Sequence, residues 1–413
     1  AQTHSALRTV IAVDDADSLS ITGNGLRADR GGQFLVRAAN DLTIDTRLRT
    51  GADDGGTILL EAISGALAIN EIIDIGEGVL SLIAGGNVSF APASQVLNPK
   101  GRLDIESRSG SVLQAAGSTI STLGAQGAGG NVRIQALEDI ALASLDAGSA
   151  TVALRTAAGR VIEAGDDTAD DLRAGALVID SALSVGEAGR RAAPIEVAVD
   201  RLAVASVGDI ALVSSRAMKI DAITGSFPRV TSIDVDSTGF VSAGGRIEDA
   251  TVSLTGVAAG AAGKAATVSL RTSAGALSIA KPISVLGGNL YLGGAAGLSV
   301  ADGIAVSTDG GDIGLVARGA ASLGAGSSVS SAGGDVAVDL GTAGAFTMAG
   351  SAQIATAGGS VQVSAAGVAL GRIDATAAQG ASGNLVIDAG TGAISSALAA
   401  NSSDWNLAGA DLV

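Results

Sequence analysis

Residues 287–292 read GGNLYL, and the same pattern returns as GGDIGL at 310–315, GGDVAV at 333–338 and GGSVQV at 358–363. The glycine pairs that open these stretches are 23, 23 and 25 residues apart. After each pair, apolar residues occupy every second position, which is typical of a β-strand with one buried face. A fixed period of this length predicts repeats that bury their apolar faces only against neighbouring repeats.

The same period extends through most of the chain. Two more short alternations follow within a repeat, for example Leu298 to Val300 and Ile304 to Val306, which makes three brief strands per repeat. Glycine at the corners between strands permits tight bends. We therefore predict an all-β fold, a parallel β-helix solenoid of about 18 turns of roughly 23 residues. Related glycines open strands in the first part of the chain, at 31–32, 55–56, 78, 101 and 129–130.

The regularity of the repeat varies along the sequence. It is regular over residues 1–149 and again over 251–413, where it is rich in glycine and alanine. Between 150 and 250 the spacing varies, so we predict irregular turns with loop insertions there. We expect a single continuous β-helix over 1–413. Another repeat begins at Asn384 and the sequence then stops without a capping element, so we also expect a segment of a larger protein.

Composition limits the kinds of protein that the chain can be. Apolar residues make up 47% of it, enough to bury a core, and this excludes disorder. Aromatic residues are only 2%, so we expect a narrow core lined by small and branched side chains. The net charge of −16 disfavours binding to nucleic acid. No apolar run approaches the ~18 residues of a membrane-spanning helix, so we expect no membrane insertion of this segment.

Two stretches carry a resemblance to a known family. Residues 359–368, GSVQVSAAGV, and residues 183–202, where Pro194 leads into an amphipathic strand, are similar to segments of the filamentous-haemagglutinin-like bacterial exoproteins. The resemblance of the repeat covers nearly the whole chain. It implies a right-handed β-helix that is exported and lies outside the cell, secreted or on the bacterial surface. It also implies a role in adhesion, aggregation or biofilm matrix.

Few residues could carry catalysis. His4 is the single histidine and cysteine is absent, which excludes the usual catalytic triads and zinc sites of ordinary composition. Some β-helix proteins are polysaccharide lyases or hydrolases, and Asp234 and Asp236 share one strand face as a catalytic carboxylate pair would. No basic cluster lies near this pair, so we predict no catalytic residue and no enzyme. A carbohydrate-active β-helix enzyme is the alternative.

Acidic runs offer oxygen ligands for a cation. Calcium prefers such ligands, and Asp53 and Asp54 form one of the runs. Solvated corner loops are the competing interpretation of these runs, and no cofactor other than calcium is expected. The candidate calcium ligands are Asp166, Asp167, Asp170 and Asp171.

These observations predict a structural role, as the shaft or fibre segment of a secreted or cell-surface bacterial adhesin. Residues 253–413 carry only 9 acidic and 5 basic side chains, and such a weakly charged surface favours lateral association. We therefore expect self-association, or contacts with other surface or matrix components, including polysaccharide. A calcium- or carbohydrate-binding adhesive module is a further alternative, with Tyr291 or Trp405 as the contact residue.

Overall fold

The chain folds as an all-β parallel solenoid of about 14 turns. The structure is a computed structural model, and it describes residues 10–28, 33–50, 56–165, 168–188, 193–232, 246–398 and 405–411. Each turn adds short strands that pair in parallel with strands of neighbouring turns. Phe34, for example, lies opposite Ile58, and Ile58 lies opposite Leu80. Stacked turns thereby satisfy each other's backbone N–H and C=O groups. The predicted fold class is confirmed, with about 14 turns and not 18.

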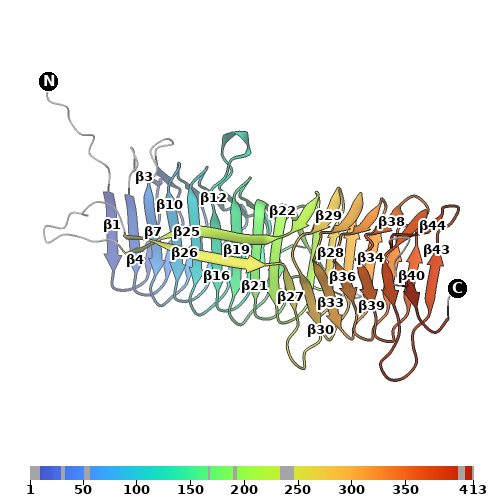
Figure 1. The fold of residues 1–413 in the computed structure, drawn as a ribbon. Coiled ribbons are helices and arrows are strands. Elements are labelled where there is room, and N and C mark those ends of the chain that lie inside the picture. Colours follow the sequence, from blue (N-terminus) through green and yellow to red (C-terminus); the bar gives the residue numbers. More distant parts are fainter. Residues whose placement is uncertain are drawn as a thin grey trace. The chain divides into compact units, whose positions relative to one another are not determined.

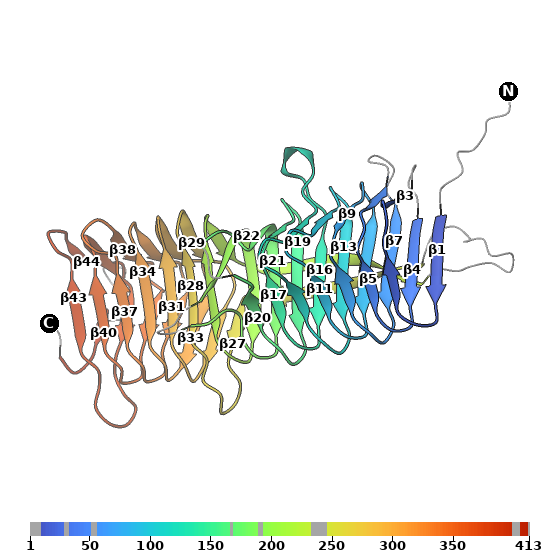
Figure 2. The ribbon, with the colours of Figure 1, turned by 180° about the vertical axis from the view of Figure 1, so that it is seen from behind.

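The chain divides into two compact units, and the first consists of residues 1–182 and 224–253. Its turns carry three columns of stacked strands, and Figure 2 shows members of the second column, among them β5, β11 and β17. The first column contains β1 (Val10–Asp15), β4 (Gln33–Ala38), β7 (Thr57–Ala62), β10 (Val79–Ala84), β13 (Arg102–Ser107), β16 (Val132–Ala136), β19 (Thr151–Thr156) and β21 (Leu172–Ser181). The second contains β2 (Leu19–Ile21), β5 (Leu42–Ile44), β8 (Leu67–Ile69), β11 (Val88–Phe90), β14 (Val112–Gln114), β17 (Ile140–Leu142) and β20 (Val161–Glu163). The third contains β3 (Leu26–Ala28), β6 (Leu48–Thr50), β9 (Ile72–Asp74), β12 (Gln95–Leu97), β15 (Thr119–Ser121) and β18 (Leu145–Asp146).

The second unit consists of residues 183–223 and 254–413 and has the same three-column plan. It begins with β22 (Ile195–Ser206), a long strand that pairs in turn with the first strand of each column. The first column contains β23 (Ile210–Ser214), β28 (Val268–Thr272), β31 (Leu290–Gly294), β34 (Ile313–Ala317), β37 (Val336–Asp339), β40 (Val361–Ser364) and β43 (Leu385–Asp388). The second contains β24 (Met218–Ile220), β29 (Ala276–Ile279), β32 (Gly297–Val300), β35 (Ala321–Leu323), β38 (Ala345–Met348), β41 (Gly367–Leu370) and β44 (Ile394–Ser396). The third contains β27 (Val257–Ala259), β30 (Ile283–Leu286), β33 (Ala305–Asp309), β36 (Ser328–Ser330), β39 (Gln353–Ala355), β42 (Arg372–Asp374) and β45 (Leu407–Ala408).

The glycine pairs of the second unit meet two different steric demands. Gly310 has a φ of +89°, in the left-handed region that favours glycine, and it turns the chain into the next strand. Gly311 follows with no room for a side chain, because a Cβ there would lie 1.9 Å from the carbonyl oxygen of Gly288, one turn earlier. The first glycine of the pair therefore makes the corner, and the second lets successive turns stack closely.

A long insertion explains why the spacing of the repeat loosens before residue 260. Ile210 of β23 lies opposite Val268 of β28, 58 residues later. The chain between them includes β25 (Ala222–Ser232) and β26 (Arg246–Thr255), which pair only with each other. Residues 222–255 number 34, and subtracting them from the 58 leaves 24, the length of one turn. Ala222–Ser232 and Arg246–Thr255 form a two-stranded ribbon outside the stack, which is one reason why the chain has fewer turns than its length predicts.

Candidate functional site

Strands β10 and β13 in the first column of the first unit are buried on both faces. All six residues of β10 are buried, and in β13 only Arg102 is exposed. In the second unit, by contrast, β37 alternates between buried and exposed residues. A strand covered on both faces reads as a nearly continuous apolar run, as residues 79–84 do with the sequence VLSLIA. The outward face of this column is therefore covered by another part of the unit.

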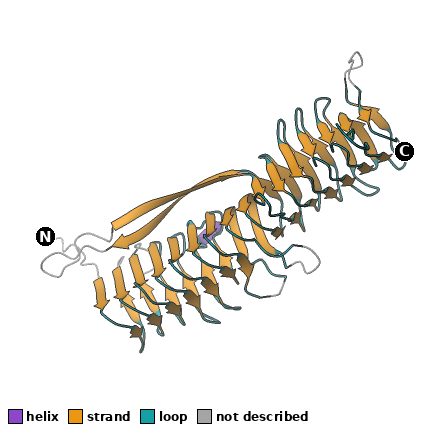
Figure 3. Cartoon of the chain, turned by 90° about the horizontal axis from the view of Figure 1, so that it is seen from below, coloured by secondary structure: helices purple, strands orange, loops and turns teal. Residues whose placement is uncertain are grey.

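The ribbon of β25 and β26 provides this cover. Its residues 224–253 belong to the first unit, and Figures 1 and 3 show both strands running across the column as a separate layer. Phe227 and Val230 of β25 are 1% and 0% exposed, so β25 packs directly on the sheet. Residues 247–249 of β26 are exposed. We call residues 222–232 with 246–255 the ribbon from here on.

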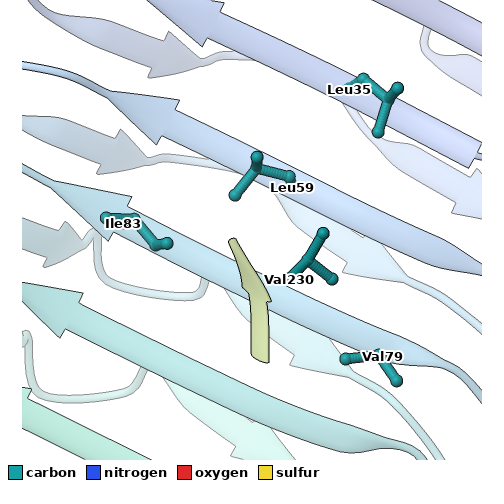
Figure 4. Close-up of a cluster of buried hydrophobic side chains, with 5 residues drawn as sticks. All are labelled: Leu35, Leu59, Val79, Ile83 and Val230. Carbon is teal, nitrogen blue, oxygen red and sulfur yellow. The ribbon is translucent and has the colours of Figure 1, made fainter. Parts of the chain in front are cut away.

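An apolar cluster fixes one part of the ribbon to the sheet. It consists of Val230 from β25 with Leu35, Leu59, Val79 and Ile83 from β4, β7 and β10 (Figure 4). None of these five side chains is more than 7% exposed. The backbone N–H of Val230 also donates a 2.7 Å hydrogen bond to the Oγ of Ser81, which is itself buried. Val230 is therefore held by both packing and a directional bond.

Buried charged side chains continue the contact on the neighbouring strands. The Arg133 guanidinium of β16 donates to Asp104 Oδ1 over 2.7 Å and to Glu106 Oε2 over 3.2 Å. Arg229 of β25 donates to the same Glu106 oxygen over 2.7 Å. We call Asp104, Glu106, Arg133 and Arg229 the ion cluster. Because Arg229 comes from the ribbon, the ion cluster ties the ribbon to two successive turns of the solenoid.

Burial and ion pairing have opposite effects on the pKa values of Asp104 and Arg133. Asp104 is fully buried, and its second oxygen, Oδ2, has no hydrogen-bond partner among the described residues. Burial raises the pKa of Asp104, and the Arg133 guanidinium offsets only part of that increase. Burial would lower the pKa of Arg133, but the carboxylates of Asp104 and Glu106 outweigh it and raise the pKa. Loss of either partner would leave a buried charge uncompensated, which is strongly destabilising.

A second group of ion pairs lies on the same face. Glu61 of β7 accepts hydrogen bonds from Arg37 over 2.9 Å and from Arg108 over 3.0 Å. Arg108 also lies 3.7 Å from Glu106, which connects this group to the ion cluster. Charged side chains of opposite sign thus come from the turns of β4, β7, β13 and β16 in this column. These carboxylates are paired with guanidinium groups, and Arg229 of the ribbon supplies one of them, so the charges connect the ribbon to the sheet.

The structure describes two of the four residues that the sequence suggested as calcium ligands. Asp166 and Asp167 lie outside the described residues. Asp170 forms an ion pair with Arg173, with 3.8 Å between Oδ2 and Nη2. Asp171 is 3% exposed, and a carboxylate oxygen of it lies within 4.8 Å of one of Glu163. The calcium prediction therefore stays a prediction for these side chains.

Of the other residues that the sequence singled out, the structure describes Tyr291 and Trp405. His4, Asp53, Asp54, Asp234 and Asp236 all lie outside the described residues. Tyr291 and Trp405, the candidate adhesive contacts, are each 44% exposed. The Arg372 guanidinium lies 4.4 Å from the centre of the Trp405 ring, so one face of this ring is occupied by a cation.

The sequence analysis missed the ion cluster and the ribbon's role in covering the sheet. Glu106 and Arg229 are 123 residues apart, and no repeat relates them. Comparisons with protein families, with curated proteins and with solved structures give no match for the chain. Among the residues that the structure describes, no helix is long and apolar enough to cross a membrane.

Proposed function

We propose that the chain is a structural segment, a shaft or fibre piece, of a secreted or cell-surface bacterial protein. The observation that carries the proposal is the pairing of each turn with the next through three columns of parallel strands in both units. Such a stack resists distortion along its length because every turn is hydrogen-bonded to two others. The resemblance of the repeat to filamentous-haemagglutinin-like exoproteins supports a role in adhesion, aggregation or biofilm matrix.

The charges of the first unit support the structural proposal over an enzymatic one. Asp104, Glu106 and Glu61 each accept hydrogen bonds from arginine side chains on the covered face. A hydrolase or lyase needs carboxyl groups that reach a substrate, and the ribbon lies over these. We infer that the described carboxylates of this face hold strands together.

Two measurements test the proposal. An antibody raised against the chain should label intact cells of the source organism, as expected for surface display. Labelling that appears only after lysis would contradict the proposed location. Incubation of the purified chain with acidic and neutral polysaccharides should release no new reducing ends or unsaturated products. Product release that depends on chain concentration would instead support the carbohydrate-active alternative and overturn the structural proposal.

A further inference from the structure

A cavity of about 400 Å³ opens between the ribbon and the outward face of the first column. Its lining comes from the sheet on one side and from both strands of the ribbon on the other. The lining residues are Arg102, Asn131, Ser226, Pro228, Ile247 and Asp249. This volume lies within the range of roughly 300 to 1,000 Å³ that is usual for small-molecule sites. The cavity is separate from the ion cluster, none of whose residues lines it.

Arg102 differs from the other arginines of this unit. Its exposed side chain forms no ion pair or hydrogen bond with any residue that the structure describes. Because Arg102 has no carboxylate partner, all the N–H donors of its planar guanidinium are available to a bound anion. Ion pairs with carboxylates are formed by Arg37, Arg47, Arg49, Arg108, Arg133, Arg155, Arg160, Arg173 and Arg229.

Asp249 of β26 supplies the opposite charge to the lining. Its exposed carboxylate also has no side-chain partner among the described residues, and it forms no ion pair with Arg102. The cavity therefore presents one unpaired cation and one unpaired anion that do not neutralise each other. A ligand that carries both a carboxylate and an ammonium group would neutralise both.

The remaining lining residues limit what else the ligand can contain. Asn131 is already engaged, because its Nδ2 donates to the Ser226 carbonyl over 2.9 Å and its Oδ1 accepts from the Thr151 N–H over 3.0 Å. These bonds also brace the ribbon against the sheet and hold this wall in place. Pro228 and Ile247 add apolar surface, and Ile247 is 47% exposed. An aliphatic group of the ligand could cover that surface.

We propose that this cavity binds a small zwitterion, of the class of aliphatic α-amino acids. The Arg102 fork would hold the carboxylate through two parallel hydrogen bonds, and Asp249 would accept from the ammonium group. Pro228 and Ile247 would contact the aliphatic side chain. The inference does not depend on the proposed structural role, because it concerns only the lining of this cavity.

Titration of the full chain with L-valine at low ionic strength, followed by ligand-observed saturation-transfer NMR, tests the proposal. Saturable binding is expected, with the dissociation constant raised at least tenfold by Arg102→Gln and by Asp249→Asn. Neither variant should alter the fold, because neither side chain has a partner to lose. Arg155→Gln is the matched control, since Arg155 is an exposed arginine that does not line the cavity, and binding should be unchanged.

Analogues with one charged group separate the two contacts. Isovalerate lacks the ammonium group and isobutylamine lacks the carboxylate, so each should bind at least tenfold more weakly than L-valine. Absence of saturable L-valine binding would overturn the proposal, and so would equal binding by the Arg102→Gln variant. Tighter binding of glucuronate, which offers hydroxyls in place of the ammonium, would also overturn it and would indicate a sugar site.

Discussion

Replacing Val230 with alanine tests whether the apolar cluster holds the ribbon on the first unit. The substitution removes the equivalent of two buried methylene groups at a side chain that is 0% exposed. At about 0.8 kcal/mol each, with a further contribution from the cavity left behind, docking of the ribbon should weaken by about 2 kcal/mol. Since 1.4 kcal/mol corresponds to a factor of ten, the undocked population should rise by about 30-fold.

Native-state amide hydrogen exchange measures this population directly. The N–H of residue 230 donates to Ser81 Oγ, so it exchanges only when the ribbon leaves the sheet. We expect its exchange to accelerate by about 30-fold, while amides of the second unit keep their rates. Val316→Ala is the matched control, because Val316 is 50% exposed and should cost less than about 0.5 kcal/mol. An unchanged rate at residue 230 would refute the clamp described for this cluster.

Three further substitutions probe other parts of the molecule. Arg229→Met keeps the aliphatic stem but removes the ion pair with Glu106. Docking of the ribbon should therefore weaken by about 1 to 2 kcal/mol, measured by the same hydrogen-exchange assay. A change within experimental error would argue against a stabilising role of that pair. Gly311→Ala should destabilise the second unit by about 3 kcal/mol or more in urea denaturation, because its Cβ would strike the Gly288 carbonyl. Gly314→Ala should cost far less, because its Cβ would lie 3.0 Å from the movable Tyr291 ring and 4.0 Å from the nearest backbone atom, the Leu290 carbonyl oxygen. Equal costs at these two glycines would contradict the stacking argument. Asp104→Asn should become more stable relative to the native chain as pH rises from 4 to 7, and the opposite trend would show that burial does not dominate at Asp104.

The sign of the pH effect follows from the raised pKa of Asp104. Burial raises this pKa above its ordinary value of 3.8, so the folded chain keeps the proton to a higher pH than the unfolded chain does. The contribution of Asp104 to stability is therefore greatest below pH 3.8 and declines as pH rises through the folded pKa. Asparagine does not titrate, so the difference in unfolding free energy between native chain and variant isolates this contribution. Urea denaturation of both proteins across pH 4 to 7 measures it.

The sequence could predict the turns because the signals for them are local. A glycine pair and the alternation after it lie within six residues, as at 310–315, and both recur at the period of the stack. The number of turns was predicted wrongly, in part because length was divided evenly among repeats. Ala222–Ser232 and Arg246–Thr255 form a ribbon outside the stack, and their composition does not distinguish them from the strands of the stack.

Part of the ion cluster could also have been predicted. The glycines at 101 and 129–130 set the register that places Asp104 opposite Arg133, so an acid and a base on adjacent turns could have been inferred from the repeat, although the sequence analysis did not infer them. The apolar run at 79–84 is likewise a local signal that could have been used to predict a strand covered on both faces. Val230 and Arg229 could not have been predicted as the cover, because their contacts with residues 149 and 123 positions earlier belong to tertiary packing outside the repeat.

We propose a structural role for this chain because its turns each pair with the next. Single-molecule pulling on the purified chain through its two ends tests that claim most directly. We expect the chain to resist force and to lengthen in successive steps of about one turn, each releasing roughly 80 Å of extended chain. Smooth extension at the low forces that stretch an unfolded polypeptide, without resolved steps, would contradict it.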